Sequence, residues 1–407
     1  MYQQRGYRHL DSPVGISFAQ RSEDASFVAR HSFLPLLHYE KRTKRYRPLK
    51  HKTEFKKRPI MYASHRDACI LSRYAHVLTN VLNEYYVERG LSECVMAYRQ
   101  LGKANYHFAE EVVEFARKIA PCSILSFDIT GFFDNLDHRL LKDRLKRVLQ
   151  VSELSRDWYA VFRHVTRFSW VWRDDLKNHP KFGERFNGKR VAPIATIAEV
   201  RAEGVKISKN ANRFGIPQGT PISSAFSNLY MIDFDAALQG CCKANGALYK
   251  RYSDDILIVC PKDAAEAFEN FIKGRIKLEK LTLNESKSER HVFDPSKIEN
   301  AQYLGFNFSP DGVTIRQSSL SRQWRKMRKS LKRIRKAGEA AIAAGKADKV
   351  FTKTLRRRFT AQPVRNFSSY ARRSAKALNS PKILRQIRRL ERAVENELRD
   401  FPSPKRP

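Results

Sequence analysis

The chain has 407 residues, of which 42% are hydrophobic and 11% aromatic, enough for a substantial core and two or three subdomains. Its 78 Lys and Arg residues against 42 Asp and Glu residues give a formal net charge of +36 and a pI near 10.2. This composition excludes a disordered chain and favours nucleic acid as the partner. A ribosome-like or membrane-surface protein is the alternative that charge alone leaves open.

Neither a secretory leader nor a membrane span is visible in the sequence. The first residues, MYQQRGYRHLDSPVG, contain no apolar run of signal-peptide length, and no window approaches the ~18 apolar residues that a span needs. The six cysteines form no CxxC pair, which is typical of reduced core cysteines. We therefore expect a cytoplasmic protein.

The N-terminal part of the sequence predicts two helices and then a strand. Residues 1–50 are polar, lack clear periodicity and predict no element. Apolar residues at helical spacing predict one helix over residues 66–88 and another over 109–119. After a proline, the apolar run at 123–129 predicts a buried strand with Asp128 near its end.

Further along, an insertion, a hairpin and a basic appendage follow. Residues 151–212 are basic and rich in aromatics, and we interpret them as an insertion without a legible function. Two β-prone runs, 248–252 and 256–259, flank an Asp-Asp pair and predict a hairpin with acids at its tip. Residues 316–407 hold 28 Lys and Arg against 6 Asp and Glu, about +22 of the net charge, on helical apolar stripes.

These acids are candidate metal ligands. If the strand and the hairpin are neighbours in one sheet, then Asp128, Asp254 and Asp255 converge. Phosphoryl transfer to a 3′-hydroxyl uses two divalent cations roughly 3.5–4 Å apart, and hard oxygen ligands suit Mg²⁺. A Tyr-x-Asp-Asp match is weak when it stands alone, because an Asp-Asp turn is commonly just a solvated hairpin.

The motifs around these acids, taken in order, resemble the reverse transcriptases of bacterial retroelements and defence systems. The resemblance is collinear and covers about residues 50–310. The matching blocks are KRPI (57–60), HRD (65–67), AYR (97–99), FDITGFFDNLDH (127–138), GIPQGTPIS (215–223), NLY (228–230), YKRYSDD (249–255), LNESKSE (283–289) and YLGF (303–306).

The resemblance implies an α+β fold: a right-hand polymerase with fingers, a palm on a ferredoxin-like antiparallel sheet, and a helical thumb. The implied subdomain limits are an N-terminal extension at 1–49, fingers at 50–120, a palm at 121–310 with an insertion at about 151–212, and a basic helical thumb at 311–407. Phosphate contacts from such a thumb would hold the product duplex and make binding depend on salt.

The same resemblance implies the catalytic residues. Asp128, Asp254 and Asp255 would bind two Mg²⁺ ions, which Mn²⁺ can replace, and the carbonyl of Ile129 would be an extra ligand. Lys287 matches a position where a lysine protonates the leaving pyrophosphate. A plain surface lysine is the alternative reading of Lys287.

Three further residues match positions around the incoming nucleotide. Phe133 corresponds to the aromatic residue that stacks under the sugar and excludes a ribose 2′-hydroxyl, with a core phenylalanine as the alternative. Arg58, and with it Lys52, would neutralise the triphosphate, because phosphate favours guanidinium forks and lysine point charges. In so basic a chain, a solvated surface role is the alternative for Lys52.

The remaining implied substrate-binding residues belong to a glycine turn and to the acidic hairpin. Gln218 and Gly219 resemble the turn that packs against the incoming nucleotide and template base, where glycine permits close backbone approach. A purely structural turn is the alternative. Tyr252 completes the hairpin, and many relatives carry Ala where this chain has Ser253.

Among reverse transcriptases, the chain most resembles the defence-associated enzymes of the Unknown Group classes. We expect no RNase H, integrase or His-Asn-His endonuclease unit beside the polymerase. The implied partners are an RNA template, most readily a partner non-coding RNA, a cDNA product and dNTPs, with no membrane and with a homo-oligomer left open. Alternatives are a retron-like or intron-derived enzyme, a template-independent DNA polymerase, and a non-enzymatic RNA-binding module.

Overall fold

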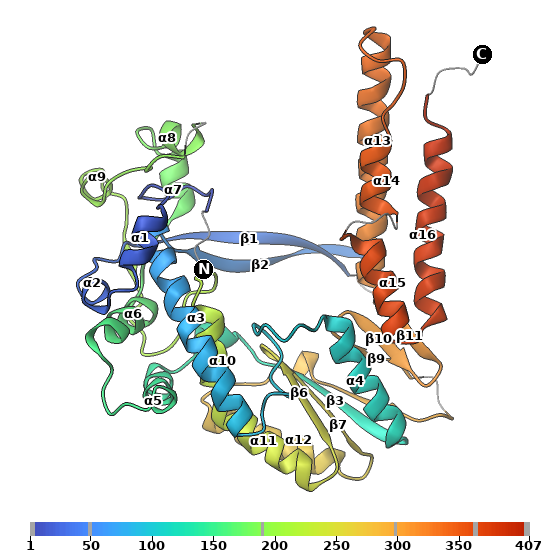
Figure 1. Cartoon of the computed structure of the whole chain (residues 1–407), viewed down its shortest axis with the longest axis horizontal. Helices are drawn as coiled ribbons and strands as arrows, with labels where there is room; N and C mark the ends of the chain where they lie inside the picture. The colour runs from blue at the N-terminus through green and yellow to red at the C-terminus, as the bar shows by residue number, and fades with distance from the viewer. Residues whose placement is uncertain (1–4, 48–50, 189–190, 297–298, 361–364, 403–407) are drawn as a thin grey trace.

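The structure is a computed structural model that describes residues 5–47, 51–188, 191–296, 299–360 and 365–402. It has three parts, which Figure 1 shows as fingers at the left, a palm sheet below and upright thumb helices at the right. Across the described ranges, we find no helix with the length and apolar character that crossing a bilayer demands.

The fingers combine the N-terminal segment, one long helix and a small mixed sheet. Helix α3 (His65–Glu88) is capped by Ser64, whose side chain accepts a hydrogen bond from the Asp67 amide. The helix expected over 66–88 is therefore confirmed. The sheet has the strand order β2-β1-β4-β5. The other elements up to this point are α1 (Ile16–Arg21), α2 (Ala25–Ala29), β1 (Leu36–Arg47) and β2 (Lys52–Tyr62).

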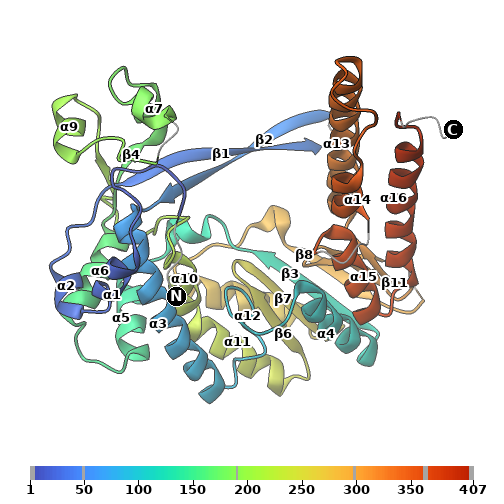
Figure 2. The same cartoon turned by 45° about the horizontal axis from the view of Figure 1, so that its top comes forward.

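Strands β1 and β2 form a long antiparallel hairpin that extends from the fingers over the palm toward the thumb (Figures 1 and 2). The expected limit between an N-terminal extension and the fingers, at residues 49 and 50, lies between β1 and β2 in sequence and outside the described residues. The N-terminal segment therefore supplies one of the two strands. The proposed subdomain limits otherwise stay a prediction.

Residues 151–212, expected to be an insertion, contribute two strands to the fingers sheet. Strand β4 (Ser169–Trp172) runs parallel to β1 and joins its sheet, and β5 (Ser208–Lys209) follows at the edge. The helices of this part of the chain, with the one before it, are α5 (His138–Val148), α6 (Arg156–Thr166), α7 (Arg173–Asn178), α8 (Gly183–Asn187) and α9 (Ile197–Ala202).

The palm is a four-stranded sheet with the order β6-β7-β3-β8, antiparallel at every pairing. Its strands are β3 (Cys122–Asp128), β6 (Leu248–Tyr252), β7 (Asp255–Pro261) and β8 (Glu289–Phe293). Its helices are α4 (Asn105–Lys118), α10 (Ser223–Tyr230), α11 (Ile232–Ala244) and α12 (Ala265–Leu278). The predicted strand and acidic hairpin are thus confirmed, and the helix expected at 109–119 begins four residues earlier.

The two faces of the palm sheet are covered by different layers. On one face, Leu125 and Ile256 pack into a core with α3, α10, α11 and α12, while on the other Ile124 and Leu257 pack with α4 and the thumb. Because side chains alternate along a strand, the parity of Ile124 and Leu257 places Asp128 and Asp255 on the face shared with α4 and the thumb.

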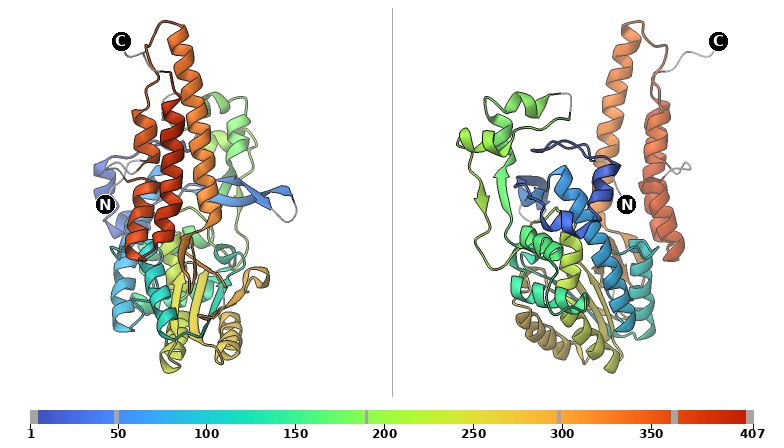
Figure 3. Two further views of the ribbon diagram at one scale, coloured as in Figure 1. Left: turned by 90° about the vertical axis from the view of Figure 1, so that its right-hand side faces the viewer. Right: turned by 60° about the vertical axis from the view of Figure 1, so that its left-hand side comes forward.

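The thumb stands on a small sheet at the end of the palm (Figure 3). Its first helix, α13 (Gln317–Ala343), and its last, α16 (Pro381–Arg399), bear the two predicted apolar stripes, and both helices are confirmed. The remaining elements are β9 (Ala301–Tyr303), β10 (Phe306–Ser309), β11 (Gly312–Ile315), α14 (Lys353–Phe359) and α15 (Phe367–Ala377). Fingers, palm and thumb together confirm the expected α+β right-hand fold.

Candidate active site

The palm sheet brings the first and last of the three acids side by side. Asp128 ends β3, Asp255 begins β7, and the two are direct partners in the antiparallel register. Partners in such a register project from the same face of a sheet. Asp254 lies in the preceding turn, and its carbonyl accepts a 3.3 Å hydrogen bond from the amide of Ile129. Backbone pairing therefore gathers all three acids at one end of the sheet.

A loop after α12 fixes the end of β3 from the other side. The amide of Asn284 donates a 2.7 Å hydrogen bond to the carbonyl of Asp128, and the amide of Thr130 donates at 2.9 Å to the carbonyl of Thr282. This loop continues into a short 3-10 helix, η3 (Glu285–Lys287). Nζ of Lys287 lies 2.5 Å from Oδ2 of Asp128. The structure therefore brings this lysine, the expected proton donor, to the cluster of aspartates.

The surroundings of the site shift the pKa of one of its acids, Asp255. The pKa of Asp255 is raised to about 6, first because nearby atoms desolvate its carboxyl group and second because Asp254 and Asp128 carry negative charge. The residue as a whole is exposed to solvent. Cations relieve repulsion of this kind.

The oxygen ligands of the three acids fit divalent metal ions, but the acid side chains are not already arranged as a complete metal site. Carboxylate and carbonyl oxygens are the ligands that Mg²⁺ prefers. Within the part of the chain that the structure describes, no three His, Cys, Asp or Glu side chains are gathered closely enough to hold a metal ion. Lys287 contacts Oδ2 of Asp128, so a metal ion bound at that oxygen would compete with this lysine.

A groove of about 810 Å³ opens in front of the acids. It is lined by Asp128 and Asp255, by Arg316 at the base of the thumb, and by Glu54 and Lys56 of the fingers hairpin. Lys56 was not expected from sequence as a site residue, although the alternation in KTEFKKRP places it on one strand face with the expected pair.

That pair, Arg58 and Lys52, lies on β2 at even positions, on the face that Lys56 shares. Both side chains are exposed, and neither lines the groove around the acids. The structure therefore places them on the same strand face as Lys56 without bringing them to the carboxylates. A triphosphate-binding role for Arg58 and Lys52 stays a proposal.

The glycine turn is held against the edge strand of the fingers. The amide of Met61 on β2 donates a 2.8 Å hydrogen bond to the carbonyl of Gln218. Gly219 has φ +121°, and a Cβ there would lie 2.7 Å from the Met61 carbonyl oxygen. Only glycine tolerates this conformation and this approach. The turn is thus a structural joint between fingers and palm, whatever it contacts on a nucleotide.

Phe133 and Tyr252 are the two aromatic residues that were expected at the site. Phe133 belongs to the 3-10 helix η2 (Phe132–Asn135), is partly exposed, and its carbonyl accepts a 2.8 Å hydrogen bond from the amide of Ile216. Tyr252 ends β6, is partly exposed and is the register partner of Asp255. The register places Tyr252 beside Asp255, whereas the contact of Phe133 is with the segment before the glycine turn. The substrate roles of both residues stay proposals.

A buried ion pair below the acidic turn was missed in the sequence. Arg251 is fully buried and donates to both carboxylate oxygens of Asp235, at 2.7 and 2.6 Å. It also donates to Oδ1 of Asn228 at 3.3 Å and to the carbonyl of Ser253 at 3.0 Å. Ser253 has φ +62°, in the left-handed region, so Arg251 holds the residue that turns the chain into the acids.

Comparison with known proteins gives the family. The family described as "Reverse transcriptase (RNA-dependent DNA polymerase)" matches residues 50–308, more than half of the chain. The chain therefore belongs to the reverse transcriptase family, whose enzyme class is RNA-directed DNA polymerase and whose members use divalent metal ions. No curated protein matches the chain.

Among solved structures, the chain is similar to telomerases of two Candida species. It is 11% identical to apo telomerase from Candida tropicalis truncated from its C-terminal domain, with a TM-score of 0.49, over 74% of this chain and 60% of that one. It is 12% identical to telomerase from Candida albicans in complex with the TWJ fragment of telomeric RNA, with a TM-score of 0.44, over 95% and 66%. The chain thus spans 60% and 66% of the lengths of these telomerases.

Proposed function

We propose that this chain copies an RNA template into cDNA, with Asp128, Asp254 and Asp255 as the metal-binding acids. The observation that carries the proposal is the direct register of Asp128 with Asp255 on the face of the palm that opens into the groove. When bound, two divalent ions would activate the 3′-hydroxyl of the primer and neutralise the charge of the leaving pyrophosphate. The carbonyl of Ile129 completes the ligand set.

The remaining residues of the site bind and orient the substrates. Lys287 gives a proton from Nζ to the leaving pyrophosphate, and its contact with Asp128 shows that this nitrogen reaches the acids. Arg58 and Lys52 on the fingers hairpin attract the triphosphate of a dNTP, and Lys56 on the same strand face adds positive charge beside them. Phe133 packs under the sugar, and Gln218 and Gly219 form the turn beside the base pair.

The biological setting that the sequence favours is bacterial antiphage defence with a partner non-coding RNA as the template. The support is the aromatic-rich segment at 151–212 together with the basic thumb, whose residues 316–407 carry 28 Lys and Arg, because these features resemble the Unknown Group enzymes. Positive charge at this density holds a nucleic-acid backbone and makes its binding salt-dependent. The thumb would hold the RNA–DNA product as it leaves the palm.

This proposal is tested by recovering the nucleic acids that the protein holds in its host. The wild-type chain and an Asp255→Asn variant are purified from cells with and without phage, and the bound RNA and DNA are sequenced. We expect one dominant small RNA bound to both the wild type and the variant, and complementary cDNA bound to the wild type alone. Mixed cellular RNA, or equal amounts of cDNA on the wild type and the variant, would contradict the proposal.

A further inference from the structure

Tyr98 contacts the acidic turn from outside the four strands of the palm sheet. Its hydroxyl lies 3.1 Å from Oγ of Ser253, within hydrogen-bond distance. Tyr98 is 49% exposed, whereas Ser253 is buried, with 4% of its surface exposed. The hydrogen bond therefore joins a half-exposed tyrosine to the buried serine that immediately precedes Asp254.

Ser253 occupies a position that ordinarily belongs to glycine or asparagine. Tyr252 and Asp255 are register partners, so Ser253 and Asp254 form a two-residue hairpin loop between β6 and β7. Such loops need a positive φ at their first residue. Ser253 has φ +62° there, a conformation that costs a serine roughly 1–2 kcal/mol. The surroundings of Ser253 must therefore hold it in place.

The segment that leads to Tyr98 lies along β6, the edge strand of the palm sheet. The amide of Arg251 donates a 2.7 Å hydrogen bond to the carbonyl of Cys94, and the amide of Met96 donates at 3.1 Å to the carbonyl of Arg251. The two segments run parallel here. Backbone pairing therefore brings Tyr98 to Ser253 in a fixed register.

Tyr98 is also held by the residues on either side of it. The carbonyl of Ala97 accepts a 2.9 Å hydrogen bond from Nδ2 of Asn228, and Nε of Arg99 donates at 2.8 Å to Oδ1 of Asn83 on α3. Between these contacts Tyr98 has φ +64°, in the left-handed region. A residue other than glycine keeps such a conformation only where its surroundings over-determine it.

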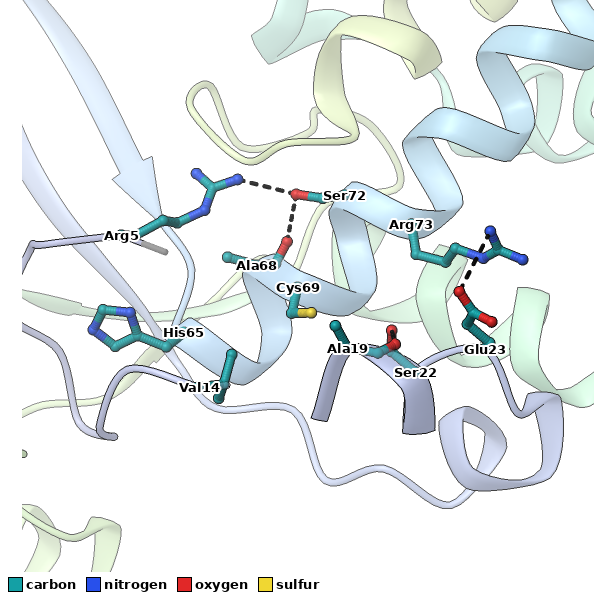
Figure 4. Close-up of a pocket in the computed structure, with 10 residues that line it drawn as sticks. All are labelled: Arg5, Val14, Ala19, Ser22, Glu23, His65, Ala68, Cys69, Ser72 and Arg73. Atoms are coloured by element: carbon teal, nitrogen blue, oxygen red, sulfur yellow. Dashed lines mark hydrogen bonds and ion pairs between the residues drawn. The ribbon is translucent and has the colours of Figure 1, made fainter. Parts of the chain in front are cut away.

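Helix α3, which supplies Asn83, is anchored near its other end by the N-terminal segment. Arg5 donates a 3.0 Å hydrogen bond to Oγ of Ser72 (Figure 4). The carboxylate of Asp11 accepts from the amides of the first two residues of the helix, at 2.9 Å each. The support of Tyr98 thus rests on a helix that is itself fixed to the fingers.

The charge of Asp254 acts on the hydroxyl of Tyr98. The pKa of Tyr98 is raised above its ordinary value, first because nearby atoms desolvate the hydroxyl and further because Asp254 is negative, against the opposing effect of the hydrogen bond with Ser253. Tyr98 therefore keeps its proton at neutral pH. Its hydroxyl remains available to hold Ser253 whenever the acids are ionised.

We propose that Tyr98 is a positioning residue, whose hydrogen bond to Ser253 fixes the acidic turn and with it the direction of the Asp254 carboxylate. Without this bond the turn can leave its strained conformation, and the carboxylate then samples directions away from its two partners. Ligands held in one geometry bind and act better than mobile ones. The inference rests on the proposed polymerase function and adds to it a residue outside the palm strands.

The test is a double-mutant cycle. Tyr98→Phe, Ser253→Ala and the double variant are compared with the wild type in single-turnover incorporation on an RNA template with a DNA primer. Each single variant removes the same hydrogen bond, so we expect each to lower the maximal rate about fivefold with unchanged affinity for dNTP. The double variant should lose no more than either single variant.

Tyr159→Phe on α6 is the matched control, because Tyr159 is 48% exposed, almost the same as Tyr98. It should keep the wild-type rate. Losses that multiply to about 25-fold in the double variant would mean that Tyr98 and Ser253 act independently, and would overturn the proposal. Single variants that react at the wild-type rate would overturn it as well.

A second measurement needs no catalysis. Binding of Mn²⁺ to the full chain is followed through the electron paramagnetic resonance of the free ion. The Kd for Mn²⁺ should rise about fivefold in each single variant and no further in the double variant. Unchanged Mn²⁺ binding in the single variants would overturn the proposal. A wild type that adds no nucleotide, while the variants show this coupled loss of binding, would contradict only the proposed polymerase function.

Discussion

Arg251 and Asp235 form a fully buried, bidentate ion pair directly beneath the turn that carries the acids Asp254 and Asp255. Burial alone would lower the pKa of Arg251, but the carboxylate of Asp235 outweighs it and keeps the guanidinium charged. Tyr249 adds a 2.6 Å hydrogen bond to the same carboxylate. The pair therefore holds β6 and the helix α11 in one fixed relation below the site.

The first prediction concerns this pair. Arg251→Met leaves a buried carboxylate without its partner and should lower the free energy of unfolding by about 3–5 kcal/mol. The double variant Arg251→Met/Asp235→Leu should recover much of that stability. It should not recover polymerase activity, because the Ser253 carbonyl still lacks the hydrogen bond from Arg251. Urea unfolding and primer extension measure the two effects. A fully active double variant would show that the pair is only a stabilising device.

A second prediction concerns the joint between fingers and palm. Gly219→Ala places a methyl group against the Met61 carbonyl in a left-handed conformation, so it should reduce nucleotide incorporation strongly and destabilise the fold by about 1–3 kcal/mol. The control, Gly240→Ala, is exposed on α11 with open space around it and should stabilise the helix by up to about 1 kcal/mol. Single-turnover rates and thermal unfolding distinguish the two. Equal incorporation rates and stabilities for the two variants would contradict a structural role for Gly219 between fingers and palm.

A third prediction concerns Lys287. If its Nζ protonates the leaving pyrophosphate, Lys287→Met should lower kcat by about 100-fold or more, with little change in the KM for dNTP. The control, Lys280→Met, removes an exposed lysine that pairs with Asp137 at 2.7 Å, a contact expected to matter little. Pre-steady-state incorporation rates measure both. A loss of the same size in the control would argue against a chemical role for Lys287.

A fourth prediction concerns pH and the fully buried His9. Its Nδ1 accepts from the amide of Leu10 and its Nε2 faces the carbonyl of Tyr62, which suits the neutral ring. Burial lowers the pKa of His9 to about 4, against the opposing effect of Asp11 and Asp67. Between pH 6.5 and about 4 the unfolded chain binds a proton that the folded chain does not, so stability falls as pH falls.

The measurement is the free energy of unfolding as a function of pH for the wild type and for His9→Gln. The variant should be less stable at pH 7, and its stability should fall by up to about 3 kcal/mol less than that of the wild type between pH 6.5 and 4. Parallel pH profiles for the two proteins would show that His9 does not titrate in this range.

The strands that carry the three acids could be predicted from sequence because they are short, buried and locally encoded. The apolar run before Asp128 and the two runs that flank Asp254 and Asp255 became β3, β6 and β7, and their pairing confirmed that the strands are neighbours. The thumb helices were equally visible, since each has one apolar stripe on a charged background.

The fingers hairpin could not be predicted, for a physical reason. Residues 52–62 of β2 are exposed over most of their length on both faces, so no apolar alternation marks the strand. Its partner β1 and the parallel strand β4 are more than 100 residues apart in sequence, and such pairing leaves no local signal. The Arg251–Asp235 pair was missed because an arginine inside a β-prone run gives no sign of being buried with a distant acid.

The most direct measurement of the central claim is single-nucleotide incorporation on an RNA template with a DNA primer, in Mg²⁺, by the wild type and by Asp254→Asn. We predict that the wild type adds the complementary dNTP, and that the variant binds the same primer–template with equal affinity but adds none. Incorporation by the variant at the wild-type rate, or a wild type that adds no deoxynucleotide opposite RNA, would contradict the account.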